Sequence, residues 1–224
     1  MGLTILLGLF VFGLIIGLPV AVTLGVASAA YLWFAGIPLV TIPQKMYAGM
    51  DSFVLLCIPG FILAGNLMNA GGITVRIVRL AQAMVGWMRG GLGLTNVAAS
   101  MLFGGISGTA AADAASIGGM MIPGMKKAGY PVDFSAAITA ASSTVGPIIP
   151  PSVPMIIVGT LSGISVGKMF IAGAIPGLMM GGAMMITAWI IAKRRNFPRQ
   201  AWMGWGELMR AFMGAFWAVM MTVL

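Results

Sequence analysis

The chain contains no histidine and a single cysteine, Cys57, which lies inside an apolar run. Protein zinc sites are built largely from histidine and cysteine, and a disulfide framework needs paired cysteines. These absences exclude a disulfide scaffold and a Cys/His cluster, so we expect no transition metal and no redox or zinc chemistry.

Charge is also scarce. Only 7% of the 224 residues are charged and 60% are hydrophobic, whereas an ordinary soluble domain has about 25% charged residues. Apolar runs near or above ~18 residues recur along the chain, and that length spans ~30 Å of hydrocarbon as a helix. The sequence therefore predicts an all-α polytopic membrane protein.

Basic residues outnumber acidic ones 12 to 4, which gives a net charge of +8. In a soluble protein this excess would suggest a nucleic-acid partner, but here the basic residues lie in short loops between apolar runs. That distribution is the topology signal of a membrane protein. We expect contact with the lipid bilayer and none with nucleic acid.

Residues 1–72 are predicted to form scaffold transmembrane helices. The run from Leu3 has neither a basic segment before it nor a cleavage site soon after it, so it is predicted to be a membrane segment rather than a signal peptide. As one helix, residues 3–34 would reach about 48 Å, which is too long for an upright span. They form either one kinked, tilted helix or two short helices broken near Pro19.

Residues 73–90 place Arg76 and Arg79 opposite apolar side chains. This pattern predicts an interfacial amphipathic helix whose basic side chains reach the lipid headgroups. The alternative is an ordinary cytoplasmic connecting helix.

Residues 91–125 carry one charge, Asp113, and a centre rich in glycine and serine at residues 104–109. As one helix they would reach about 52 Å, well beyond ~30 Å of hydrocarbon. Basic residues flank them on both sides: Arg89, Lys126 and Lys127. Because such flanks favour the cytoplasm, residues 91–127 are predicted to form a re-entrant helical hairpin. Two complete short spans with a periplasmic turn are the alternative.

Residues 131–163 contain a cluster of prolines at positions 147, 150, 151 and 154. Each removes a backbone donor and blocks a continuous helix, so a broken transmembrane helix is predicted. Residues 168–195 are predicted to form a plain transmembrane helix that ends in a cytoplasmic basic cluster. Residues 196–224 are predicted to be a cytoplasmic connection and the start of a further transmembrane helix.

Two polar centres interrupt these apolar stretches: residues 107–109 at the predicted hairpin tip and residues 142–144 before the predicted break. Broken helices expose carbonyl groups, which suit Na⁺, and N–H groups, which suit a carboxylate. The centres therefore predict a cation site and an anion site. The alternative is that glycine and serine only allow helices to pack closely.

Four motifs extend this interpretation: residues 58–66 (IPGFILAGN), 103–113 (FGGISGTAAAD), 127–130 (KAGY) and 142–152 (SSTVGPIIPPS). They resemble the large membrane subunit of tripartite ATP-independent periplasmic (TRAP) transporters, the DctM type. The resemblance covers nearly the whole chain.

This resemblance implies a multi-pass permease of the bacterial inner membrane, not an enzyme, that uses Na⁺ and no organic cofactor. It implies uptake of organic anions such as C4-dicarboxylates or sialic acid. The implied partners are a periplasmic substrate-binding protein and a small four-helix membrane subunit. An elevator mechanism is also implied, in which hairpins and broken helices form the moving domain.

Site residues follow from the same resemblance. The implied Na⁺ site comprises Ser107, Gly108, Thr109, Thr144, Val145, Gly146 and Pro147. The implied substrate site comprises Ser107, Gly108, Thr109, Ser142 and Ser143.

Such subunits contain two inverted repeats, and only the first is expected here. A truncated or split membrane scaffold without transport activity is therefore the alternative function. A membrane enzyme would need a nucleophile with a base or paired acids, whereas Asp113 is the only acid in an intramembrane run. Asp113 either orients the hairpin tip, binds an ion or a proton, or lies exposed at a helix end.

Overall fold

The computed structural model describes residues 2–51, 55 and 57–223, and the regular elements in these ranges are all helices. This confirms the all-α prediction. The chain divides into two units, Met1–Phe53 and Val54–Leu224, which we describe separately.

In the first unit, α1 (Gly2–Ile15) and α2 (Val20–Phe34) pack against each other, and α3 (Thr41–Met50) follows. Gly17 adopts a φ of +84° in the turn before Pro19, where the chain reverses. Residues 3–34 therefore form two short apolar helices, the second of the alternatives left open by the sequence.

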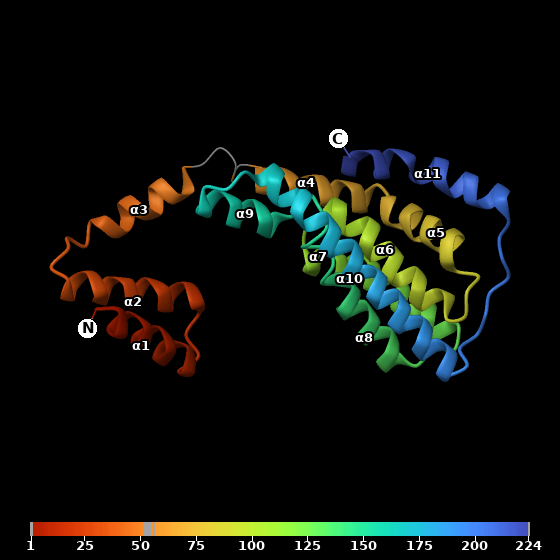
Figure 1. Cartoon of the computed structure of the whole chain (residues 1–224), viewed down its shortest axis with the longest axis horizontal. Coiled ribbons are helices and arrows are strands. Elements are labelled where there is room, and N and C mark those ends of the chain that lie inside the picture. Colours follow the sequence, from red (N-terminus) through yellow and green to blue (C-terminus); the bar gives the residue numbers. More distant parts are fainter. Residues whose placement is uncertain (1, 52–54, 56, 224) are drawn as a thin grey trace. The chain divides into compact units, whose positions relative to one another are not determined.

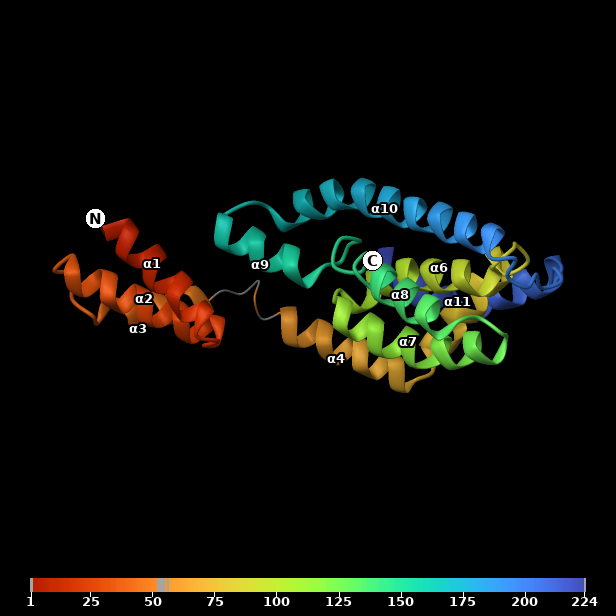
Figure 2. The same cartoon turned by 90° about the horizontal axis from the view of Figure 1, so that it is seen from below.

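In its described residues the second unit contains eight helices: α4 (Cys57–Ala70), α5 (Ile73–Val85), α6 (Gly91–Ser107), α7 (Ala110–Lys127), α8 (Val132–Ser143), α9 (Val153–Ser162), α10 (Val166–Arg194) and α11 (Trp205–Val223). The central helix is α6, which packs against α4, α5, α7, α8, α10 and α11 (Figure 1). Seen from below, α10 lies on one side of α6 and α7 on the other (Figure 2).

The sequence of α6 explains its central place. It is rich in glycine, alanine and serine, and nearly all of its side chains are buried. Small residues let neighbouring helices approach closely, which is how helices associate where the hydrophobic effect between them is weak. Larger side chains such as Leu94, Val97 and Phe103 fill the remaining space in the core.

By length and composition, one helix within the described ranges, α10, could cross a membrane by itself. The pair Ile58–Ala70 and Ile73–Val85 meets the same criterion together, with a bend of 73° between them. The break at Gly71 and Gly72 accounts for the bend, because Gly72 adopts a φ of +73° that other residues rarely take.

The amphipathic pattern predicted for residues 73–90 is present in α5. Ile77 and Ala81 are fully buried, and Arg79 pairs with Glu207 of α11. Arg79 therefore contacts a neighbouring helix in this structure. The position of α5 relative to lipid headgroups remains a prediction.

The basic segments gather at one end of the second unit. The ring of Tyr130, which follows α7, contacts the ring of Phe197, which follows α10, with 4.8 Å between the centroids. The burial that comes with this packing raises the pKa of the Tyr130 phenol. Arg89, before α6, pairs with Arg199 through an antiparallel backbone bridge. Both flanks of the α6–α7 pair and the end of α10 therefore lie together, an arrangement compatible with a common cytoplasmic side.

Candidate functional site

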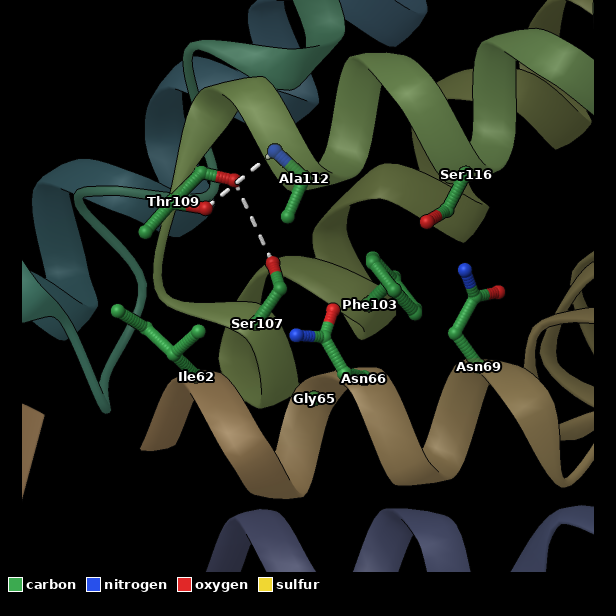
Figure 3. Close-up of a pocket in the computed structure, with 9 residues that line it drawn as sticks. All are labelled: Ile62, Gly65, Asn66, Asn69, Phe103, Ser107, Thr109, Ala112 and Ser116. Atoms are coloured by element: carbon green, nitrogen blue, oxygen red, sulfur yellow. Dashed lines mark hydrogen bonds between the residues drawn. The ribbon is translucent and has the colours of Figure 1, made fainter. Parts of the chain in front are cut away.

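The first polar centre forms the tip of a helical hairpin. Helix α6 ends at Ser107, Gly108 turns the chain with a φ of +62°, and α7 begins at Ala110. Thr109 caps α7, because its hydroxyl accepts a hydrogen bond from the Ala112 backbone N–H at 3.3 Å. The Ser107 hydroxyl donates to the Thr109 carbonyl at 3.4 Å (Figure 3).

The second polar centre begins a break between two helices. Helix α8 ends at Ser143 and α9 begins at Val153. Ser152 lies at the α9 end of the break and stabilises it, because its hydroxyl donates to the Pro147 carbonyl and accepts from the Met155 backbone N–H. Whether this break and the hairpin lie at membrane depth remains a prediction.

The hairpin tip and the break lie against each other. The Val153 backbone N–H donates to the Gly108 carbonyl at 3.3 Å. A Cβ atom placed on Gly104 would lie only 2.5 Å from the Cα atom of Gly146. The two polar centres, distant in sequence, thus come together through the close approach of two glycines.

The break also leaves backbone acceptors free. Within the described part of the chain, the carbonyl groups of Thr144 and Gly146 accept no hydrogen bond. The Val145 carbonyl, by contrast, accepts from the N–H groups of Ile148 and Ile149 at 2.9 and 3.0 Å. In the predicted Na⁺ site, the carbonyls of Thr144 and Gly146 are therefore available, whereas those of Gly108, Thr109, Val145 and Pro147 are engaged in hydrogen bonds.

A cavity of about 60 Å³ lies beside the hairpin tip. Its polar lining comes from α4 and the hairpin (Figure 3): Asn66, Asn69, Ser107, Thr109 and Ser116. Sites for organic ligands usually have about 300–1,000 Å³, whereas one water needs about 10–15 Å³ of such space. The cavity therefore has room for a few water molecules but not for an organic anion, and the Thr144 and Gly146 carbonyls do not line it.

Ser142 and Ser143, which the resemblance places in the substrate site, are buried and do not line this cavity. The Ser142 hydroxyl donates to the Asn96 amide oxygen at 3.3 Å and lies 3.1 Å from that of Ser100. The Asn96 amide in turn donates to the Thr139 hydroxyl at 2.6 Å. These residues form a polar layer that joins α6 to α8 behind the hairpin tip.

Asp113 lies beside this layer in the first turn of α7. Its side chain is fully buried, and neither carboxyl oxygen has a hydrogen-bond partner among the described residues. The hydroxyls of Ser100 and Ser143 are its polar neighbours, without hydrogen-bond geometry. The N-terminus of α7 favours a negative charge at this position. An unpaired buried carboxylate nevertheless lowers the stability of the fold by several kcal/mol, about as much as the loss of one partner from a buried ion pair.

Sequence reasoning did not assign Asn66, Asn69, Asn96, Ser116 or Thr139 to a site. Asn66 was recognised only as part of a motif. The sequence shows these residues only as single amide or hydroxyl side chains inside apolar runs. Such a pattern does not reveal which side of the helix faces a site, because that depends on how the helix packs.

The family model described as the DctM component of the tripartite ATP-independent periplasmic transporters matches residues 6–224. The chain belongs to this family. The resemblance carried by the hairpin and break motifs is thereby confirmed.

Curated relatives agree. The chain is 42% identical, over 225 residues, to the 2,3-diketo-L-gulonate TRAP transporter large permease protein of Escherichia coli, with 100% of this chain and 53% of the relative covered. It is 39% identical to the C4-dicarboxylate TRAP transporter large permease protein of Vibrio cholerae, with 98% and 49% covered. It is 42% identical to a sialic acid TRAP transporter permease of Haemophilus influenzae, with 93% and 34% covered.

The chain thus spans about half the length of the first two relatives and a third of the other. Membership of this family makes it a part of a membrane transporter permease. The relatives are named as transporters, and no catalytic family is indicated.

Proposed function

We propose that this chain is the first repeat of the permease of a Na⁺-coupled transporter that takes up an organic anion across the bacterial inner membrane. Three relatives are named for 2,3-diketo-L-gulonate, C4-dicarboxylate and sialic acid, which are all carboxylates. The observation that carries the proposal is the contact between hairpin tip and break, beside free carbonyls and the unpaired carboxylate of Asp113.

Coupling to a cation has a physical reason. Each charge moved across about 100 mV corresponds to about 2.3 kcal/mol. A dicarboxylate entering a cell that is negative inside therefore costs about twice that amount for each 100 mV. Entry of Na⁺ with the anion offsets this cost and adds the energy of the Na⁺ gradient.

The Na⁺ ion is bound by oxygen atoms on both sides of the contact. The hairpin offers the hydroxyls of Ser107 and Thr109, the break offers the carbonyls of Thr144 and Gly146, and Asp113 supplies the negative charge close by. Val145 and Pro147 contribute by shaping the backbone. The polar N-terminus of α7 at Gly108 and Thr109 faces the substrate carboxylate, and Ser142 and Ser143 support it from behind.

The remainder of the transport path lies outside this chain. A second repeat, a small four-helix membrane subunit and a periplasmic substrate-binding protein complete the transporter. Residues 91–127 form the re-entrant hairpin that moves with the broken helix in an elevator motion, while residues 1–72 belong to the scaffold.

Removing one hydroxyl from the hairpin tip tests the cation site. In the complete transporter, Ser107→Ala or Thr109→Ala is expected to raise the Na⁺ concentration for half-maximal uptake about 5- to 100-fold, the effect of losing one good polar ligand. The measurement is uptake into proteoliposomes with the binding protein present. The control is Thr187→Ala, which removes an exposed hydroxyl that donates to the Ala183 carbonyl within α10.

Three results would contradict the proposal. Unchanged Na⁺ half-saturation in both variants would mean that Ser107 and Thr109 serve only close helix packing. Uptake that is independent of Na⁺ in the unmodified transporter would remove the coupling altogether. A chain that assembles with its partners but supports no uptake would favour the scaffold function.

Cysteine labelling tests the re-entrant hairpin. In a Cys57→Ala background, Arg89→Cys and Lys126→Cys are both expected to react with an impermeant reagent only from the cytoplasmic side, because the two positions flank one hairpin. Ser165→Cys, exposed before α10, is the matched control and should react only from the periplasmic side. Reaction of Arg89→Cys and Lys126→Cys from opposite sides would exclude the hairpin.

A further inference from the structure

We propose that the second unit binds an anionic phospholipid at its basic end, with the headgroup beside Arg89 and an acyl chain between α5 and α11. This site is separate from the hairpin tip and does not depend on the proposed transport function. It rests on three cavities that share lining residues and run from a cluster of cations to a hydrophobic groove.

The headgroup part is a cavity of about 410 Å³. Three cationic side chains line it: Arg89, Lys193 and Arg199. The backbone bridge between Arg89 and Arg199 holds the two arginines side by side, and the Arg199 Nε donates to the Trp87 carbonyl at 3.2 Å. Within the described ranges, no acidic side chain forms a salt bridge with any of the three cations.

Two tryptophans border the cations. The Lys193 Nζ lies 5.4 Å from the centroid of the Trp189 ring, and Trp87 lines the same cavity. Tryptophan is enriched at the membrane–water interface, where its ring sits at headgroup level. The cavity therefore combines the charge and the aromatic border expected for a headgroup site.

The acyl-chain part continues from Trp87. A second cavity, of about 460 Å³, shares Trp87 and is also lined by Met84, Trp202 and Trp205. A third, of about 450 Å³, shares Met84, Trp205 and Leu208 with the second and is lined only by hydrophobic side chains. The groove runs from Trp87, just after α5, along the last turns of α5 to Leu80. At about 1.5 Å per helical residue this is roughly 10 Å, which matches a substantial part of an acyl chain.

The cationic cavity and the hydrophobic groove together favour a phospholipid over other ligands. A free phosphate would be attracted by the cations but would gain nothing from the groove. A helix of a partner protein would fill the groove but would leave three unpaired cations beside it. Basic pockets between helices on the cytoplasmic side bind anionic headgroups, and each basic residue near such a surface contributes about a fivefold preference.

Lipid binding to the purified, delipidated protein tests this site. Native mass spectrometry with phosphatidylglycerol and phosphatidylcholine of equal chain length is expected to show about tenfold or greater preference for phosphatidylglycerol. Arg89→Gln combined with Lys193→Gln should remove most of this preference. The control is Lys126→Gln combined with Arg194→Gln, which removes two exposed basic residues of the same end that do not line the headgroup cavity.

The groove has its own test. Leu208→Trp, which fills the space shared by the two hydrophobic cavities, should weaken the binding of both lipids about equally. Soluble glycerol phosphate should not compete with phosphatidylglycerol, because it lacks the acyl chain. Equal binding of the two lipids by the unmodified protein, or full competition by glycerol phosphate, would overturn the proposal even if a variant failed to fold.

Discussion

Replacing Asp113 with asparagine is expected to lower Na⁺-driven uptake by at least about 100-fold without lowering the free energy of unfolding. The carboxyl group is fully buried and has no hydrogen-bond partner among the described residues. In the proposed cation site this group is the anionic partner, and its loss should cost about 3 kcal/mol or more, as does removal of one member of a buried ion pair. Without the cation, burial disfavours the charged form of this carboxyl group, so the neutral amide is tolerated.

The measurement compares Na⁺-dependent uptake in proteoliposomes with the melting temperature in Na⁺-free buffer. Asp133→Asn is the matched control, because Asp133 is exposed and lies 3.6 Å from Arg195 at the basic end. It should change neither quantity appreciably. Normal Na⁺ half-saturation in Asp113→Asn would show that this carboxyl group is no part of the cation site and serves to orient the hairpin tip.

Adding one methyl group at Gly104 is expected to reduce uptake about 100-fold. The new Cβ atom would lie 2.5 Å from the Gly146 Cα atom, which belongs to the backbone and cannot rotate away. Overpacking of this kind costs about 1–3 kcal/mol, and displacement of a site by about 1 Å can cost 100-fold in activity. The hairpin tip must then move away from the break, and the hydrogen bond from the Val153 N–H to the Gly108 carbonyl is lost.

Gly119→Ala provides the comparison. Gly119 lies in α7 of the same hairpin, but nothing lies within 4 Å of a Cβ atom placed there. Alanine favours a helix by about 1 kcal/mol over glycine, so this variant should transport normally and melt slightly higher. Equal uptake by Gly104→Ala and the unmodified transporter would show that the close approach of the two glycines does not position the site.

Several features of this protein are determined by the sequence alone. The scarcity of charge and the long apolar runs require helices, since backbone polar groups in lipid must be satisfied within the chain. Pro147 keeps α8 from continuing beyond Ser143, because it has no N–H to donate to the Ser143 carbonyl, and Pro150 and Pro151 keep the next residues from resuming a helix. The motifs around residues 103–113 and 142–152 identify the DctM family, which the family model confirms.

The tertiary structure decided which atoms of those motifs are available. Sequence places Val145, Ser142 and Ser143 near the site, but packing engages the Val145 carbonyl and buries both serines. It also brings Asn66 and Asn69 of α4 to the hairpin tip. The physical reason is that helix rotation and the hydrogen bonds of an irregular segment depend on contacts between residues far apart in the chain, which no local pattern contains.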